Sequence, residues 1–438
     1  MSKVYISFLG TNDYLPCTYF KDSREMENVR FVQQATLEFF CRGWTGKDRI
    51  TVFSTEDAFR KNWLDDGHKD KDTRGIKKCM GLENCIKKLN LLPVLKRVPI
   101  PEGKSEQEIW EIFQIVLEEL KPEDEVIFDI THAFRSIPML AIVILNYSKV
   151  MKNITIGGIY YGAFEVLGSI FEAEKISMEK RRVPILDLTL FDQLMEWGIA
   201  IDRFSVAGDA AMVSKLANQS VKPILSESKG RDKAADTIRK IAKNLSDFSK
   251  AMVTCRGHDI SSIAGKLKEH VNTFESLELV QPFKPIFNRI KNQMNDFSGD
   301  SIMDGIQAAR WCLDHNLIQQ GYTILQETLL SYFILKIKHD QENQKYREIA
   351  GQAVTIYLKK IDRAKWKKAS ADNEQITLKL LDAYKGQDEL IKIFRNISND
   401  RNDLNHAGHN TNPMRPEAFR KKLSEMLARI ETCLADGS

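Results

Sequence analysis

The 438-residue sequence lacks a hydrophobic run long enough to cross a membrane. Its longest apolar stretch, Met139 to Leu145, falls far short of the ~20 residues that a membrane-spanning helix needs. The apolar residues Val4 to Leu9 are too few for a secretory signal and are interrupted by Ser7. We therefore expect a soluble, cytoplasmic protein that has no membrane partner.

The sequence also lacks the patterns that hold zinc or a dinucleotide. Its seven cysteines form no C-x-x-C pair and have no histidine at zinc spacing, which fits free, buried thiols in a reducing compartment. There is no G-x-G-x-x-G fingerprint and no G-x-x-x-x-G-K-[ST] loop, and Gly43 to Lys47 is only superficially similar to the latter. We expect no metal and no cofactor, and we disfavour a small-molecule Rossmann enzyme.

A strong excess of one charge is missing as well. The formal net charge of +4 is too small to indicate nucleic-acid binding over a broad surface, so any contact with RNA must be local. The 43% hydrophobic and 28% charged content is that of a globular protein, and 438 residues exceed what one hydrophobic core usually organises. We expect two domains or three.

The N-terminal part alternates short β-rich runs with amphipathic helical windows, which is typical of an α/β domain with a mostly parallel sheet. Ser105 and Glu108 form a capping box at one helix start, and Pro138 suits the first turn of another helix. The predicted strands are Val4–Leu9, Arg49–Ser54, Leu95–Ile100, Glu125–Ile130, Ile154–Tyr161 and Val183–Leu186, and the predicted helices are Arg24–Arg42, Glu106–Leu120 and Pro138–Met151.

From about Leu188 the β-type runs disappear, and apolar residues recur at three- and four-residue spacing to the C-terminus. We place the domain boundary near Asp187. The sequence thus predicts a Rossmann-like α/β domain over residues 1–187 and an all-helical region over residues 188–438.

Two predicted strand ends of the α/β domain carry polar residues that suit a ligand. In an open parallel sheet, ligands bind outside the carboxyl ends of the strands. Gly10, Thr11 and Asn12 follow the first strand and offer a close turn with two small polar side chains. The strand that ends near Ile130 is followed by a loop dense in hydrogen-bonding groups, which are Asp129, Thr131, His132, Arg135 and Ser136.

That second loop has two interpretations. Thr131, His132 and Ser136 can donate to phosphate oxygens, and Arg135 can do so bidentately or stack on a base. Alternatively, Asp129 and Ser136 cap the following helix while Arg135 pairs with Asp129, although one helix start needs only one cap. Tyr160 and Tyr161 end a strand on the same side, where an aromatic ring either stacks on adenine or simply packs.

Ile6 to Thr11 and Asp129 to Ser136 resemble segments of the CRISPR-associated Rossmann fold (CARF) sensor family. CARF domains bind cyclic oligoadenylate, and family habit favours the cyclic tetraadenylate. The resemblance also implies a homodimer, or a higher multiple of dimers, in which two sensor domains form one symmetric pocket. The ligand-binding residues that it implies are Gly10, Thr11, Asn12, Asp129, Thr131, His132, Arg135 and Ser136.

The densest polar cluster of the helical half, Asn396 to Gly408, contains Arg401 and His406 in an R-x-x-x-x-H arrangement. Nearly every residue there is polar yet compatible with a helix, and Gly408 is the expected C-cap. Asn402 precedes His406 by four residues and so shares its helix face. Because asparagine is costly inside helices, we expect a functional gain to offset this composition.

The same spacing occurs at Arg310 and His315, so spacing alone does not single out a site. The residues between Arg310 and His315 are mostly apolar, which indicates a packed core helix and a structural histidine. A basic stretch, Lys229 to Lys250, is predicted to be a helix with a buried apolar stripe, and a solvated face fits it better than a groove for RNA.

Arg401 and His406 suit the metal-independent cleavage of RNA by its own 2′-hydroxyl. An imidazole with an ordinary pKa of about 6.5 can move protons near neutrality, and a guanidinium matches phosphate oxygens. Asn402 would orient the imidazole or the substrate. The alternative is a solvated helix end, whereas metal catalysis is disfavoured because Asp400 and Asp403 lack a defined partner set.

The segments Ala309 to Gly321 and Arg401 to His406 resemble the HEPN ribonuclease domain of CARF–HEPN effectors from type III CRISPR systems. The resemblance places a HEPN core at about residues 300–438 and implies that two copies of Arg401, Asn402 and His406 build one catalytic site for single-stranded RNA. We expect an antiviral endoribonuclease that cyclic oligoadenylate activates. A nucleotide-responsive regulator without nuclease activity is the alternative.

Overall fold

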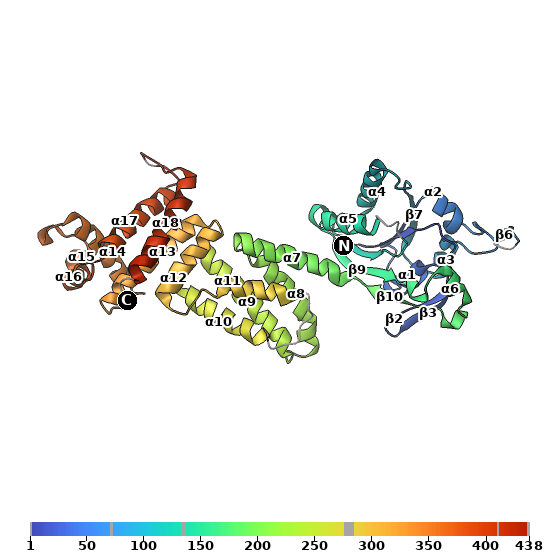
Figure 1. Cartoon of the computed structure of the whole chain (residues 1–438), viewed down its shortest axis with the longest axis horizontal. Helices are drawn as coiled ribbons and strands as arrows, with labels where there is room; N and C mark the ends of the chain where they lie inside the picture. The colour runs from blue at the N-terminus through green and yellow to red at the C-terminus, as the bar shows by residue number, and fades with distance from the viewer. Residues whose placement is uncertain (1, 71–72, 133–136, 276–283, 410, 436–438) are drawn as a thin grey trace. The chain divides into compact units, whose positions relative to one another are not determined.

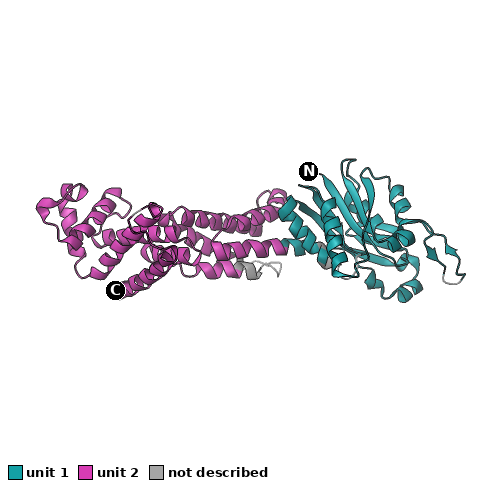
Figure 2. Cartoon of the chain, turned by 90° about the horizontal axis from the view of Figure 1, so that it is seen from above, with its two compact units in different colours: residues 1–193 teal, residues 194–438 magenta. Residues whose placement is uncertain are grey.

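The computed structural model describes residues 2–70, 73–132, 137–275, 284–409 and 411–435. The chain divides into two compact units, Met1–Gln193 and Leu194–Ser438, which Figure 2 colours separately. The division falls inside helix α7 (Thr189–Ala207), which begins just after the change in composition at Asp187.

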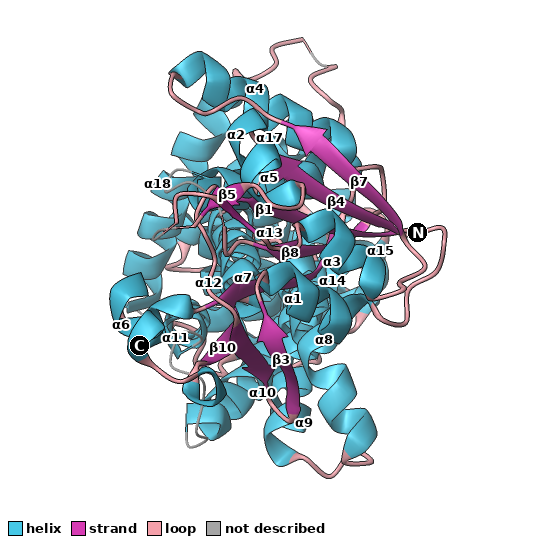
Figure 3. Cartoon of the chain, turned by 90° about the vertical axis from the view of Figure 1, so that its right-hand side faces the viewer, coloured by secondary structure: helices cyan, strands magenta, loops and turns pink. Residues whose placement is uncertain are grey.

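Unit 1 is built on an eight-stranded sheet (Figure 3). Its strands are β1 (Lys3–Leu9), β2 (Cys17–Lys21), β3 (Arg24–Val29), β4 (Arg49–Ser54), β7 (Val94–Pro99), β8 (Glu125–Asp129), β9 (Thr155–Gly162) and β10 (Arg182–Asp187). They lie in the order β3-β2-β10-β9-β8-β1-β4-β7. The five neighbouring strands β7, β4, β1, β8 and β9 are all parallel, so the predicted mostly parallel sheet is confirmed.

Alternation along β1 explains the layers on both faces of the sheet. Tyr5 and Leu9 join one core, whereas Val4, Ile6 and Phe8 join the core on the other face, because successive strand residues point to opposite sides. Helices α1 (Val32–Cys41) and α3 (Leu82–Lys88) cover the first face, and α4 (Glu106–Glu119) and α5 (Ile137–Lys152) cover the second. The predicted α/β class is therefore confirmed.

The connections reverse direction beside β1. After β2 and β3 at one edge of the sheet, the chain adds β4 and β7 on one side of β1 and then β8 on the other side of β1. Such a reversal opens a crevice at the carboxyl ends of the two strands, and ligands of open α/β sheets bind there. The loops after Leu9 and Asp129 both start at this crevice.

The helix predicted over Arg24 to Arg42 is wrong in its first half. Residues Arg24–Val29 form β3, which pairs antiparallel with the unpredicted strand β2, and the helix begins only at Val32. The segment is rich in helix-forming side chains, but its pairing with β2 is a tertiary contact that local preference does not reveal. The capping box is half right, since Ser105 caps α4 while the Glu108 carboxylate accepts from the Lys104 N–H at 2.9 Å.

Short elements fill the connections of unit 1. They are α2 (Glu56–Ala58), the π-helical η1 (Phe59–Trp63), the hairpin β5 (His68–Lys69) with β6 (Ile76–Lys77), the 3₁₀ helix η2 (Phe164–Leu167), α6 (Ile170–Lys175) and the 3₁₀ helix η3 (Met178–Lys180).

Unit 2 is helical throughout its described residues, as the sequence predicts (Figure 1). Beyond α7 its helices are α8 (Ala211–Glu227), α9 (Lys233–Val253), α10 (Gly257–Glu275), α11 (Lys284–Met294), α12 (Ser301–Asp314), α13 (Ile318–Lys336), α14 (Gln344–Lys359), η5 (Arg363–Lys365), α15 (Ala369–Asp372), α16 (Glu374–Ala383), α17 (Asp388–Asn405) and α18 (Pro416–Ala435).

Two hydrophobic cores divide the helices of unit 2. One lies among α7 to α12, and the other among α12 to α18. Helix α12 belongs to both, because Trp311 and Cys312 face the first core while Ala309 and Leu313 face the second. Helix α13 is shared in the same way through Ile324 and Leu325.

Among the described residues, no helix combines the length and the apolar character that a membrane span requires. All seven cysteines are free thiols. The prediction that they are buried holds for Cys17, Cys41, Cys85 and Cys312, whereas Cys79, Cys255 and Cys433 are partly exposed.

Candidate functional site

The ends of β1, β8 and β9 surround a cavity of about 140 Å³ in unit 1. Of the residues predicted to bind a ligand, Asn12, Thr131 and His132 line this cavity. Gly10 lies in the same loop, where an added Cβ would collide with the Tyr14 hydroxyl, so any other residue there would displace the Tyr14 side chain. Thr11 also lies in this loop, whereas Arg135 and Ser136 lie outside the described residues.

Asp129 holds the loop that lines the cavity through hydrogen bonds. Its side chain is fully buried, and its oxygens accept hydrogen bonds from Tyr5 Oη (2.9 Å), Thr36 Oγ1 (3.3 Å), Thr131 N (3.0 Å) and Thr131 Oγ1 (2.6 Å). Burial raises the pKa of this carboxyl, against the effect of the donors. Asp129 therefore holds Thr131 in place, and Thr131 Oγ1 in turn accepts the Gly162 N–H at 2.8 Å.

Asn62 fixes the loop after β1, and sequence reasoning missed it. Its buried amide donates to the carbonyl oxygens of Gly10 (2.9 Å) and Asn12 (2.8 Å). Its side-chain oxygen lies 2.9 Å from His68 Nε2 in the hairpin β5–β6. A single asparagine in an unrelated segment gave no sequence signal for this role.

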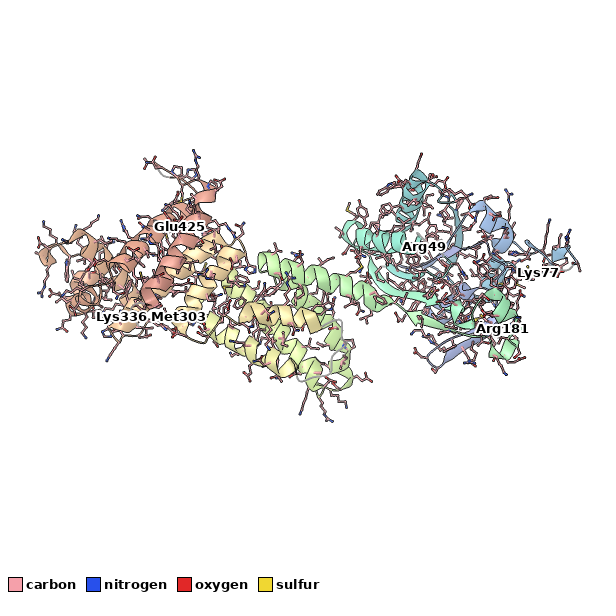
Figure 4. All side chains as sticks on the ribbon, in the orientation of Figure 1. Arg49, Lys77, Arg181, Met303, Lys336 and Glu425 are labelled. Carbon is pink, nitrogen blue, oxygen red and sulfur yellow. The ribbon has the colours of Figure 1, made fainter. Side chains whose placement is uncertain are left out.

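A charged cluster borders the cavity and was also missed. Arg30 and Asp13 both line the cavity, and their ion pair measures 3.3 Å. Lys77, which Figure 4 labels on the β5–β6 hairpin, lies 2.6 Å from the other Asp13 oxygen. Burial opposes ionisation of Asp13, but Lys77, with His68 and Arg30, holds its pKa below the ordinary value.

His132 presents a neutral imidazole to the cavity. Its ring lies against the Tyr14 ring with a centroid separation of 4.1 Å. Burial lowers the pKa of His132 to about 3, so the ring is uncharged near neutral pH. Its Nε2 is shielded from solvent and has no hydrogen-bond partner among the described residues. A buried polar atom of this kind is available to a ligand.

The two tyrosines at the end of β9 differ in their surroundings. The Tyr160 ring stacks on Phe40 at 3.7 Å and 4°, so it packs in the core. Tyr161 lines the cavity, and its hydroxyl donates to Glu165 at 2.8 Å. Stacking on a base therefore stays a hypothesis for Tyr161 alone.

The predicted catalytic residues lie at the C-terminal end of α17, with His406 at its C-cap. Arg401 is partly buried, and its Nη1 donates to Gln326 Oε1 at 3.2 Å and lies 3.6 Å from Glu327 Oε1. Asn402 and His406 are exposed. No contact between the Arg401 and His406 side chains is seen among the described residues, so one chain does not join them into a single hydrogen-bonded set.

The C-cap of α17 is His406 and not Gly408 as predicted. Ala407 follows it in the left-handed region with φ of 51°. The Ala407 N–H bonds to Leu404 O (3.2 Å) and the Gly408 N–H to Asp403 O (3.1 Å), which is a Schellman motif. The residue after His406 is thus a strained alanine.

The competing pair on α12 is structural, as the sequence indicates. His315 is 7% exposed, stacks on Trp311 at 3.9 Å, and its Nδ1 lies 2.7 Å from Trp311 O. Arg310 forms an ion pair with Glu431 of α18. The basic stretch Lys229 to Lys250 forms most of α9, whose Ile241 and Leu245 are buried.

Among the described residues, no group of three or more histidine, cysteine, aspartate or glutamate side chains is arranged to hold a metal ion. The acidic side chains near Arg401 have other contacts. Asp400 is buried beside Tyr322 Oη and Lys422 Nζ, each at 3.4 Å, and Asp403 accepts the Met414 N–H at 2.7 Å.

Comparisons with known proteins match two segments of the chain. Residues 4–165, which include both strand-end loops, match the model of the CARF domain of CRISPR system endoribonuclease Csx1. Residues 193–301 match the model of the second domain of CRISPR-associated protein MJ1674. Arg401 and His406 lie outside both segments.

The CRISPR-associated protein MJ1674 of Methanocaldococcus jannaschii is 26% identical over 267 residues. The match covers 59% of this chain and 37% of the relative, so the chain spans well under half of that protein's length.

The α/β domain thus carries a cavity at its strand ends, where open α/β sheets bind ligands, and a helical region follows it. Residues 4–165 are thus a CARF-type domain, and the chain is similar to a CRISPR-associated protein.

Proposed function

We propose that this protein is a metal-independent endoribonuclease that cyclic oligoadenylate switches on in type III CRISPR defence. Residues 1–187 are the sensor, residues 188–438 are the helical effector region, and the HEPN core begins near residue 300. Single-stranded RNA is the substrate, cyclic tetraadenylate is the favoured activator, and a cytoplasmic homodimer is the working form. The observation that carries the proposal is the pairing of a CARF domain with Arg401 and His406 at one helix end.

The sensor cavity supports a cyclic activator shared by two chains. Its volume of about 140 Å³ lies below the ~300–1,000 Å³ of pockets that enclose a whole small ligand. One chain therefore encloses only part of a cyclic oligonucleotide, and a second copy completes the pocket. Asn12 supplies a side-chain donor, Arg30 supplies charge, and His132 Nε2 supplies a buried unpaired atom.

The helix end supports phosphodiester chemistry. His406 is exposed at the C-cap of α17, where an imidazole can transfer a proton to or from RNA. Arg401 is held toward α13 by Gln326 and Glu327, and its guanidinium would stabilise charge on the phosphate. Since one chain does not join the two side chains, a second copy of α17 would complete the site.

The activator acts by preferring the arrangement in which the two helix ends meet. A ligand shifts such an equilibrium only through its different affinity for the two arrangements. Cleavage should therefore depend on the cyclic nucleotide and not only on RNA.

The test measures cleavage of a single-stranded RNA in EDTA, with and without cyclic tri-, tetra- and hexaadenylate. We expect one cyclic nucleotide to raise the rate and His406→Ala to lower the activated rate by about 10²-fold or more. The control variant is His409→Ala, which removes an exposed imidazole from the same turn and should leave the rate unchanged.

Two results would contradict the proposal. Full activity in His406→Ala would exclude the proposed chemistry, and equal rates with and without every cyclic nucleotide would exclude the switch. Binding of cyclic nucleotide without any RNA cleavage would favour a nucleotide-responsive regulator.

A further inference from the structure

Unit 2 contains a second cavity, of about 410 Å³, between its two hydrophobic cores. The turn from α9 to α10 forms one wall, with Cys255 and Arg256. Helix α13 forms the opposite wall with Ile324, Glu327 and Ser331. The volume falls in the lower part of the ~300–1,000 Å³ range of small-ligand pockets, which suits one nucleotide.

The cavity adjoins the proposed catalytic arginine through Glu327. One carboxylate oxygen of Glu327 lies 3.6 Å from Arg401 Nη1, and the other accepts from Arg347 Nη2 at 2.7 Å. Arg347 also donates to Ser331 Oγ (2.9 Å) and to Gln341 O (2.7 Å). Glu327 is therefore held in place as a shared wall between the cavity and Arg401.

A second contact links α13 to the end of α17. Gln319 of α13 donates to Asn405 Oδ1 at 3.1 Å, so the helix that lines the cavity is tied to the helix end that carries Arg401.

The residues that line the cavity offer groups that can bind the phosphate of a nucleotide and groups that can bind its base. Arg256 is exposed at the cavity and has no ion pair among the residues that the structure describes, and it precedes the N-terminus of the 19-residue helix α10. Both features favour a phosphate. Ser261, Ser301 and the Glu342 carboxylate, which also line the cavity, can accept hydrogen bonds from the amino group of a base.

We propose that this cavity binds one nucleotide of the RNA substrate directly beside the scissile bond, with Arg256 on its phosphate. The inference rests on the proposed function, because it places the neighbouring phosphodiester on Arg401. The carboxylate at the base end favours adenine, cytosine or guanine over uracil, since only those three bases carry an exocyclic amino donor.

The first experiment measures RNA binding separately from cleavage. Full-length His406→Ala is titrated with a short, fluorescein-labelled single-stranded RNA over a range of salt concentrations, in the presence of cyclic tetraadenylate. Adding Arg256→Gln should weaken binding about 10-fold and reduce the slope of log K against log salt by about 0.7, the value for one lost phosphate contact on a single strand. Arg256→Lys should retain the slope.

Arg231→Gln is the matched control, because Arg231 is an exposed arginine of the same helical region that does not line the cavity. It should leave the slope unchanged. Circular dichroism would confirm that each variant is folded.

The second experiment sequences the RNA fragments that are produced by the protein that retains His406. We expect uracil to be under-represented at one position beside the cut, and Glu342→Gln to weaken this bias. If RNA is cleaved but Arg256→Gln keeps the full salt slope, the subsite is wrong and the proposed function stands. If the unmodified protein neither binds nor cleaves RNA, both are wrong.

Discussion

The sensor cavity and the end of α17 differ in how far their polar side chains are buried and hydrogen-bonded. In the sensor, Asp129 is 0% exposed and accepts four hydrogen bonds, and Asn62 ties down the neighbouring loop from inside the fold. At the end of α17, His406 and Asn402 are exposed, and Arg401 has one hydrogen bond to Gln326 and a long contact to the Glu327 carboxylate. Buried, satisfied networks pre-organise a pocket, whereas exposed groups become ordered only against a partner or a substrate.

The largest effect on stability should follow from removing the sensor anchor. Asp129→Ala leaves the Thr131 N–H without its acceptor in a buried site, and we expect a loss of about 3 kcal/mol in the free energy of unfolding of the sensor. Binding of cyclic oligoadenylate should fall with it, because Thr131 lines the cavity. Thermal unfolding and calorimetric titration measure the two effects.

Asp400→Ala is the matched change near the helix end. Asp400 is also buried, but its contacts to Tyr322 and Lys422 are 3.4 Å long, so we expect a loss of about 1 kcal/mol. A larger loss in Asp400→Ala than in Asp129→Ala would break the contrast between the two sites.

Acidification should weaken the sensor through His132. Its pKa is about 3 in the folded chain and about 6.5 when unfolded, so the unfolded state binds the extra proton first. Stability is therefore fully present above about pH 6.5 and falls as the pH decreases, by about 1.4 kcal/mol per unit, or about 2 kcal/mol between pH 6.5 and 5.

His132→Gln should remove that part of the pH dependence. The comparison uses the melting temperature of the sensor transition in both proteins at pH 7 and at pH 5. If the melting temperature falls equally in both proteins between pH 7 and pH 5, the His132 ring is protonated as easily in the folded chain as in the unfolded chain.

The same contrast explains which parts of the molecule could be predicted from the sequence. The short apolar run of β1 and the apolar periodicity after Leu188 are local signals, and they led to the α/β and all-helical classes. The strand β3 was mistaken for helix because its partner β2 is the reason it is a strand. The shared role of α12 in two cores likewise depends on contacts across the fold.

The site residues likewise divide into those with a local sequence signal and those that depend on contacts across the fold. Thr131 and His132 could be predicted because they directly follow a strand, where any open α/β sheet binds ligands. Asn62, Arg30 and Asp13 reach the cavity from separate segments, so no local motif reveals them. Asp129 was predicted to contact the ligand; its oxygens accept hydrogen bonds from Tyr5, Thr36 and Thr131, which hold the loop in place.

The smallest effect concerns the turn behind His406. Ala407 has φ of 51°, a conformation that glycine adopts without the cost that a Cβ brings. Ala407→Gly should therefore raise the free energy of unfolding by about 0.5–1 kcal/mol. Ala428→Gly is the control with the opposite sign, because Ala428 is exposed inside α18 and glycine there should cost about 1 kcal/mol. Differential scanning fluorimetry compares the two, and a lower melting temperature in Ala407→Gly would show that Ala407 is not strained.

Strained backbone beside a proposed catalytic side chain often serves to position it. We accordingly expect the more stable Ala407→Gly protein to cleave RNA more slowly, since a relaxed turn holds the His406 imidazole less firmly.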